Sequence, residues 1–305
     1  MNLELIKPPR LKPGATIGVA AVSGPVDGAR LESGISFLRE KGYRVERATN
    51  LGRRDGFLAG SDEERASEYR RLLSDDRIDA IFFARGGYGA SRILGLLPPE
   101  EARAHPKIHL GASDLTALFA FLRRQAGLVT FYGPMVAVGL GDRLPLDWES
   151  VLSGATPARQ DFSPQDVIAS GSAEGELVGG CLSLLASLAG TPEAVRASGA
   201  ILFWEDTREE IYRLDRLLTQ LERSGNLDSL RGMVIGSVVS RGPTESPEQI
   251  GEYLHVRFGR SPFPVACNFP AGHLASPRTL PLGTRVRLDL GKTGSLTFLE
   301  PGVAP

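Results

Sequence analysis

The sequence predicts an α/β protein with two domains, and three observations lead to this prediction. Apolar runs typical of strands alternate with helical patterns through the first half, which indicates a parallel sheet covered by helices. Residues 141–168 are rich in Pro, Asp, Ser and Gly, a composition typical of a linker. The length of 305 residues suits two ordinary domains. We therefore expect a first domain over residues 1–140, a linker over 141–168 and a second domain over 169–305.

In the first half, each predicted strand ends in a turn and most are followed by a helix. Apolar residues at helical spacing predict the helices, and Ser61-Asp62-Glu63-Glu64 is a capping box that opens one of them. Because ligands bind at the carboxyl ends of strands in parallel sheets, the turns at Gly24, Gly86 and Ser113 mark the expected site. The predicted strands are Ala15–Val22, Tyr43–Ala48, Asp79–Ala84, Ile108–Leu110 and Val129–Tyr132.

The second half has strand and helix patterns in a different arrangement. Glu176–Ala189 is largely apolar with Gly179-Gly180 inside it, and one apolar stripe predicts a helix over Glu209–Leu221. Alternating apolar residues over Thr284–Leu299 predict a hairpin that turns at Gly291-Lys292-Thr293-Gly294. The other predicted elements are strands over Ile201–Trp204 and Met233–Val239, a helix over Ser246–Phe258 and an extended segment over Val265–Asn268.

Composition and charge restrict the classes of function. The net charge of −1 gives no general attraction to nucleic acid or to an anionic membrane. The chain has no apolar run of about 18 residues and no secretory signal at its start, so we expect a cytoplasmic protein without a membrane span. Cys181 and Cys267 lie in apolar surroundings and are expected to be buried thiols, and no zinc-site spacing is present.

The segment Gly111-Ala112-Ser113-Asp114-Leu115-Thr116 is the most informative motif of the chain. It follows an apolar strand and precedes a helical pattern, so Ser113 lies in a sharp strand-to-helix turn. A serine there points its hydroxyl outward, next to N–H groups at a helix N-terminus that favour negative charge, as a nucleophile needs. Serine also caps ordinary helices, and the motif alone leaves both interpretations open.

Two residues of the second half could assist a serine nucleophile. His273 follows a predicted strand in a loop with Pro and Gly around it, and such rigid flanks suit a general base. Glu205 ends an apolar strand, where a carboxylate can orient an imidazole. A surface histidine and a surface acid are the alternative interpretations. His109 is expected to be structural, and His105 and His255 are expected to be solvated.

The turn Arg85-Gly86-Gly87-Tyr88-Gly89 follows the third predicted strand. It lacks the Gly-x-Gly-x-x-Gly spacing of a dinucleotide-binding loop, and such a loop would follow the first strand. Because Ser113 follows the next strand, we favour a role for this turn in supplying an oxyanion-hole N–H.

Together these motifs resemble the LD-carboxypeptidase family, the serine peptidases that include the microcin C immunity proteins. The resemblance runs from about Pro8 to Gly283, nearly the whole chain. Besides the segments around Gly86 and Ser113, the matching segments are Leu11–Val19, Ala59–Arg65, Trp204-Glu205-Asp206, Tyr212–Arg216, Gly272-His273 and Leu280–Gly283. It departs from the family pattern at Ala112, where an aromatic residue is usual, and at Cys181, where Asn usually follows the two glycines.

The resemblance implies a flavodoxin-like or class-I-amidotransferase-like N-terminal domain and a C-terminal α/β domain of mixed sheet. It also implies a triad in which Ser113 is the nucleophile, His273 the general base and Glu205 the residue that orients it. The implied reaction removes the C-terminal D-alanine of murein tetrapeptide, needs no metal or cofactor, and is carried out by a homodimer.

The resemblance further implies an oxyanion hole formed by the N–H of Asp114 with that of Gly86 or Gly87. Arg85, beside this turn, is the candidate cation for the substrate carboxylate, and Tyr88 is expected to contact substrate. A structural role for Arg85 is the alternative.

Three other functions fit parts of the pattern. A related peptidase could cleave a microcin C-like peptidyl-nucleotide, which would favour extra aromatic residues in a C-terminal loop. A non-enzymatic binding protein of two lobes would normally carry a signal peptide, which the chain lacks. A nucleotide-dependent Rossmann enzyme is disfavoured by the glycine spacing.

Overall fold

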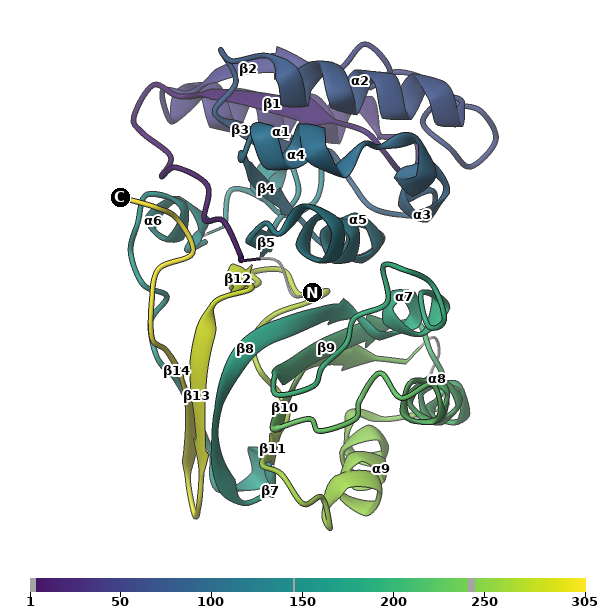
Figure 1. The fold of residues 1–305 in the computed structure, drawn as a ribbon, viewed down its shortest axis with the longest axis vertical. Helices are drawn as coiled ribbons and strands as arrows, with labels where there is room; N and C mark the ends of the chain where they lie inside the picture. Colours follow the sequence, from purple (N-terminus) through teal and green to yellow (C-terminus); the bar gives the residue numbers. More distant parts are fainter. Residues whose placement is uncertain (1–3, 145, 241–244) are drawn as a thin grey trace. The chain divides into compact units, whose positions relative to one another are not determined.

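The computed structural model describes residues 4–144, 146–240 and 245–305, and these form two compact units (Figure 1). The first unit comprises Met1–Ala155, Ala275–Pro281 and Gly302–Pro305. The second comprises Thr156–Leu274 and Leu282–Pro301. The predicted α/β class is confirmed, with a mainly parallel sheet in the first unit and a mixed sheet in the second.

The first sheet has the strand order β12 (Leu280–Leu282), β5 (Thr130–Tyr132), β4 (Ile108–Gly111), β3 (Ala80–Phe83), β1 (Thr16–Ala20) and β2 (Arg44–Arg47). Its pairs from β2 to β5 are all parallel, and the order reverses between β1 and β3, so this is where neighbouring turns diverge to leave room for a ligand. Right-handed crossovers then place α1 on one face and α2 to α5 on the other. The contacts agree, since α2 packs on α3 and α4, and α3 packs on α5.

The five predicted strands of the first unit and the helix after the predicted capping box lie close to their predicted positions. Its strands are β1 (Thr16–Ala20), β2 (Arg44–Arg47), β3 (Ala80–Phe83), β4 (Ile108–Gly111), β5 (Thr130–Tyr132) and β12 (Leu280–Leu282), whose last residue lies in the second unit. Its helices are α1 (Gly28–Glu40), α2 (Asp62–Ser74), α3 (Ala90–Ile93), η1 (Leu94–Leu96), α4 (Pro99–Ala104), α5 (Leu115–Phe121), η2 (Leu122–Ala126), η3 (Leu140–Asp142) and α6 (Trp148–Leu152). The predicted capping box is confirmed, because Glu64 N donates to Ser61 Oγ (3.2 Å) and Ser61 N donates to Glu64 Oε2 (2.9 Å).

The segment 141–168, expected to be a linker, contains short helices and strands. It contributes one buried aromatic residue to the first unit and one to the second. Trp148 of α6 is buried and meets the Phe82 ring edge-on with centroids 5.5 Å apart. Phe162 of β6 (Gln160–Phe162) is buried with its ring centroid 6.3 Å from that of Phe269. These aromatic side chains bury apolar surface that the polar composition of the segment conceals.

The second sheet has the order β6-β14-β13-β8-β9-β10-β11-β7. Its centre, β8 to β11, is parallel, whereas β13, β14 and the outer strands pair antiparallel. The predicted hairpin is confirmed as β13 and β14. The strands are β6 (Gln160–Phe162), β7 (Val167–Ala169), β8 (Gly171–Cys181), β9 (Ile201–Thr207), β10 (Gly232–Val239), β11 (Val265–Ala266), β13 (Arg285–Leu290) and β14 (Gly294–Phe298); the helices are η4 (Pro164–Asp166), α7 (Leu182–Ser187), α8 (Ile211–Arg223) and α9 (Pro247–Phe258).

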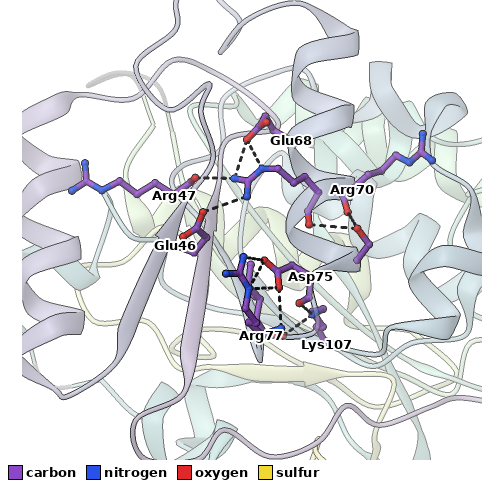
Figure 2. A network of polar contacts seen from close by, with 10 residues as sticks. Glu46, Arg47, Glu68, Arg70, Asp75, Arg77 and Lys107 are labelled. Atoms are coloured by element: carbon purple, nitrogen blue, oxygen red, sulfur yellow. Dashed lines mark hydrogen bonds and ion pairs between the residues drawn. The ribbon is translucent and has the colours of Figure 1, made fainter.

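A network of charged side chains joins β2 to α2 (Figure 2). Arg71 of α2 donates to the Arg47 carbonyl oxygen (2.9 Å) and forms ion pairs with Glu46 and Glu68. Lys107 is buried and donates from Nζ to the carbonyl oxygens of Asp75 and Ile78, both at 2.6 Å. The half-exposed ion pairs contribute little to stability, but the bonds from Lys107 hold the turn that leads into β3.

Residues predicted to be structural are buried as expected. The His109 ring lies within hydrogen-bond distance of the Lys107 carbonyl oxygen and the Tyr69 hydroxyl, both at 2.9 Å, and burial lowers its pKa to about 4. Cys181 and Cys267 are buried free thiols. Within the described ranges, no helix combines the length and the apolar content that crossing a bilayer requires.

Candidate active site

Ser113 lies in a strained turn between β4 and α5. Its φ of 62° is in the left-handed region, which few residues other than glycine adopt. The turn is held from both sides, because Ser113 N donates to the Tyr132 hydroxyl (2.9 Å) and Thr116 N donates to the Ser113 carbonyl oxygen (2.9 Å). A strained serine at this position is the arrangement found in nucleophile turns of α/β enzymes.

Gly86 packs directly against Ser113. A Cβ atom at Gly86 would lie 3.0 Å from the Ser113 Cβ and 3.2 Å from its Oγ, so only glycine fits without displacing the serine. The N–H groups of Gly86, Gly87 and Asp114 have no acceptor among the residues that the structure describes. The structure therefore brings the serine and the expected oxyanion donors together at one edge of the first sheet.

Arg85 and Tyr88 flank the same turn in different ways. Arg85 Nη1 donates to the Pro25 carbonyl oxygen (2.9 Å), which ties the guanidinium to the loop after β1. The Tyr88 ring is 48% exposed and lies 5.7 Å from the ring of Phe57, itself 63% exposed. The sequence analysis did not single out Phe57, because a lone aromatic residue in a polar loop carries no periodic signal.

In the second unit, Glu205 and His273 form a hydrogen-bonded pair. Glu205 Oε2 accepts from His273 Nδ1 at 2.7 Å and from His273 N at 3.2 Å. The Glu205 side chain is fully buried, whereas that of His273 is 30% exposed. A ring anchored through Nδ1 has Nε2 free to exchange a proton, which is what a general base requires.

The backbone after β11 carries His273 to this position. The chain runs beside β10, where Phe269 N donates to the Ile235 carbonyl oxygen (3.0 Å) and Ser237 N donates to that of Ala271 (2.9 Å). Glu205 lies at the carboxyl end of the neighbouring strand β9, opposite Cys181 of β8. The parallel centre of the second sheet thus presents Glu205 and His273 at the edge where α/β sheets bind ligands.

The pKa values in this cluster are displaced from their ordinary values. Burial lowers the pKa of His273, but the hydrogen bond and charge of Glu205 outweigh it, so the net shift is upward. Burial raises the pKa of Asp206 to about 6, against the hydrogen bonds that its carboxylate accepts from Ser183 N (2.7 Å) and Thr207 N (2.8 Å). Displaced pKa values in one cluster are typical of functional sites.

Gly272 lies so close to the Glu205–His273 pair that a side chain at this position would clash with Glu205. Its φ is +109°, and a Cβ there would lie 2.6 Å from both Glu205 Oε2 and Ser237 Oγ. We expect Gly272→Ala to lower the free energy of unfolding by about 3 kcal/mol, from backbone strain and overpacking together. We also expect it to lower kcat, because Glu205 must move away from His273. Thermal or urea unfolding measures the first effect, and kinetics of the reaction that the family resemblance implies measure the second.

Gly190→Ala is the matched control for that variant. Gly190 also has a left-handed φ, +91°, but nothing lies within 4 Å of its Cβ position. Gly190→Ala should therefore lower the free energy of unfolding by about 1 kcal/mol, from backbone strain alone, and leave the activity unchanged. Equal losses in the two variants would contradict the close approach of Gly272 to Glu205.

The comparisons with known proteins identify the family of the chain. The model for the LD-carboxypeptidase N-terminal domain matches residues 17–133, which include Ser113, and that for the C-terminal domain matches residues 174–288, which include Glu205 and His273. A relative from Bacillus subtilis named "Probable murein peptide carboxypeptidase" is 35% identical over 309 residues, which cover 98% of this chain and 95% of the relative. The chain belongs to the LD-carboxypeptidase family.

Solved structures support the same assignment over the whole fold. The muramoyltetrapeptide carboxypeptidase from Oxalobacter formigenes has a TM-score of 0.83 and 28% identity, and the match covers 93% of this chain and 98% of that one. Microcin C7 self immunity protein MccF has a TM-score of 0.85 and 26% identity, covering 98% and 100%. The chain is therefore a serine-type carboxypeptidase, which decides against the binding-protein and Rossmann alternatives.

Proposed function

We propose that this enzyme is an LD-carboxypeptidase that removes the C-terminal D-alanine from murein tetrapeptide, with Ser113, His273 and Glu205 as its triad. The observation that carries the proposal is the left-handed Ser113 turn packed against Gly86, in a chain of the LD-carboxypeptidase family. The Glu205–His273 pair supports it independently, since it supplies an oriented imidazole.

The proposed mechanism assigns each proton to a named atom. Neutral His273 takes the Ser113 hydroxyl proton at Nε2 while Oγ attacks the carbonyl carbon that precedes D-alanine. The N–H groups of Asp114 and of Gly86 or Gly87 hold the oxyanion, and each donor is worth about 3–4 kcal/mol in comparable sites. His273 then protonates the leaving amine of D-alanine, and water hydrolyses the acyl-enzyme by the same route.

Release of D-alanine from purified murein tetrapeptide tests the function directly. Tetrapeptide should be converted to tripeptide and D-alanine, whereas the same peptide ending in L-alanine should be hydrolysed poorly. A folded protein that releases no D-alanine would exclude this substrate and leave another amide substrate for the same serine.

Arg85 is proposed to bind the substrate's terminal carboxylate. We expect Arg85→Ala to raise KM for tetrapeptide by about 10- to 100-fold, as for a lost charge-assisted hydrogen bond, with a smaller change in kcat. A tetrapeptide carboxamide lacks the terminal anion. Wild type and Arg85→Ala should therefore have similar KM values for it. An unchanged KM would assign Arg85 a structural role through its bond to Pro25.

A peptidyl-nucleotide is the second candidate substrate. The resemblance to MccF favours it, because one MccF structure holds glutamyl sulfamoyl guanosine and another aspartyl sulfamoyl adenosine. In both cases the proposed step at Ser113 is attack on an acyl carbonyl. Their kcat/KM values, compared on one enzyme preparation, decide between them.

The homodimer, which rests on the family resemblance, and the cytoplasmic location expected in the sequence analysis are part of the same proposal. Light scattering of the purified protein tests the first. Fractionation of cells that produce the untagged chain tests the second.

A further inference from the structure

A positively charged side chain is buried in the first unit close to the Gly86–Gly89 turn. Arg65, in the first turns of α2, is 0% exposed. A buried cation is costly unless hydrogen bonds and opposite charges compensate it. Burial lowers the pKa of Arg65, and the carboxylates of Asp62 and Asp114 oppose that shift.

The Arg65 guanidinium joins three segments at the carboxyl edge of the sheet. Nη1 donates to the carbonyl oxygen of Val22, after β1, and to that of Gly89 at 2.9 Å. Nε donates to the Gly60 carbonyl oxygen at 3.3 Å, and Nη2 pairs with Asp62. One side chain thus fixes the loop after β1, the loop before α2 and the end of the turn after β3.

Gly89 is shaped to accept this guanidinium. Its φ is +134°, and a Cβ there would lie 2.9 Å from Arg65 Nη1 and 2.7 Å from Leu58 Cδ2. The absence of a side chain lets the guanidinium reach the Gly89 carbonyl oxygen. Lysine has a single ammonium group at this end and cannot reproduce the planar, forked set of donors.

The residue after the nucleophile holds the same turn from its other side. The Asp114 side chain is fully buried, and its Oδ2 accepts from Ala90 N, the residue after Gly89, at 2.8 Å. Residues 89 and 90 are therefore tied both to Arg65 and to the segment that carries Ser113.

We infer that Arg65 is a positioning residue of the reaction, which holds the Gly86–Gly89 turn so that its N–H groups meet the oxyanion formed at Ser113. The inference rests on the proposed function. Arg65 touches no reacting atom; it acts through the turn, and Asp114 sets the distance between that turn and the nucleophile.

Two reactions of Ser113 test this role in the full chain of each variant. D-alanine release gives kcat and KM, and phosphonylation by a fluorophosphonate reports the oxyanion hole without the peptide. We expect Arg65→Ala to lower kcat and the phosphonylation rate by about 10²-fold, as for a lost oxyanion donor, with KM changed much less. The kcat and phosphonylation rate of Arg65→Lys should lie between those of the wild type and of Arg65→Ala. Millimolar methylguanidinium should restore part of the activity of Arg65→Ala.

Arg71→Ala is the matched control. Arg71 lies on the same helix and also binds a backbone carbonyl and two carboxylates, but these belong to β2 and α2. It should keep the wild-type kcat. Thermal unfolding of each variant separates lost stability from lost positioning.

Several results would overturn the inference. These are wild-type kcat and phosphonylation in a folded Arg65 variant, a change in KM alone, or an equal loss in Arg71→Ala. If Arg65→Ala does not fold, Arg65→Lys decides by the same criteria. A wild type that is phosphonylated but releases no D-alanine contradicts only the proposed substrate, and the phosphonylation rates still decide on Arg65. A wild-type protein that is not phosphonylated and releases no D-alanine would contradict both the proposed function and the role of Arg65.

Discussion

Replacement of Ser113 by alanine should lower kcat for D-alanine release by about 10⁶-fold, the scale seen when a serine nucleophile is removed from a triad. The remaining groups cannot compensate, because binding and oxyanion donors alone leave only a small residual rate. Release of D-alanine, followed with a coupled D-amino acid oxidase, measures the loss. Ser67→Ala is the control, since Ser67 is an exposed serine on α2 whose hydroxyl donates to the Glu64 carbonyl oxygen.

Ser113→Gly separates the role of the hydroxyl from that of the backbone. It should be as inactive as Ser113→Ala but more stable, by about 1 kcal/mol, because glycine adopts a φ of 62° without strain. Equal activity of wild type and Ser113→Ala would contradict the nucleophile assignment. A glycine variant less stable than the alanine variant would contradict the strained turn.

Replacement of Glu205 by glutamine should lower kcat by about 10⁴-fold, as in triads whose carboxylate is replaced by its amide. The side chain keeps its shape, but its amide can donate to Nδ1, so the ring proton moves to Nε2. His273 can then no longer accept the Ser113 proton. Glu209→Gln is the matched control, because Glu209 follows the same strand but pairs with Arg213 at 3.3 Å. An equal loss in Glu209→Gln would contradict the assignment of Glu205.

The same variant should change the pH dependence of both activity and stability. His273 works as a neutral base, so kcat/KM of the wild type should rise with pH through a pKa above 6.5. Glu205→Gln removes the carboxylate that raises this pKa through its hydrogen bond and its charge, and it keeps the smaller contribution of the Asp206 charge. The residual rise in activity should therefore move to lower pH.

The raised pKa of His273 in the folded state determines how the stability of the protein changes with pH. The contribution of the His273–Glu205 pair is fully present below the unfolded pKa of histidine, and it is lost as pH rises through the folded value. Urea unfolding at several pH values should show a larger loss in the wild type than in Glu205→Gln, which keeps the part that comes from Asp206, whose pKa burial raises to about 6. The same pH dependence in both proteins would contradict the pairing.

The sequence predicted the elements with strong local patterns and missed those without one. The strands at Thr16–Ala20 and Ala80–Phe83 and the capped helix at Asp62–Ser74 carry strong local patterns, and all three are present. The helix at Trp148–Leu152 has only five residues, too few for a helical period, inside a segment of polar composition. The strand Leu280–Leu282 joins the first sheet from a distant part of the chain, which no local pattern indicates.

Local signals also identified the polar residues of the candidate site, but they did not identify the residue that holds the neighbouring turn in place. Ser113 and His273 stand out because each follows an apolar strand in a glycine-containing turn. Arg65 carries no such signal, because an arginine in the first turns of a capped helix is usually solvated. Its burial arises only when the ends of β1 and β3 and the loop before α2 converge on it.

The local patterns of the chain therefore specify its α/β class, most strands and the candidate nucleophile, because hydrophobic periodicity and turn chemistry are encoded in neighbouring residues. The pairing of Glu205 with His273, 68 residues apart, and the bond from Arg65 to Gly89, 24 residues apart, depend on sheet order instead. Sheet order follows from how whole elements pack to bury their apolar faces. For that reason these contacts came only from the folded chain.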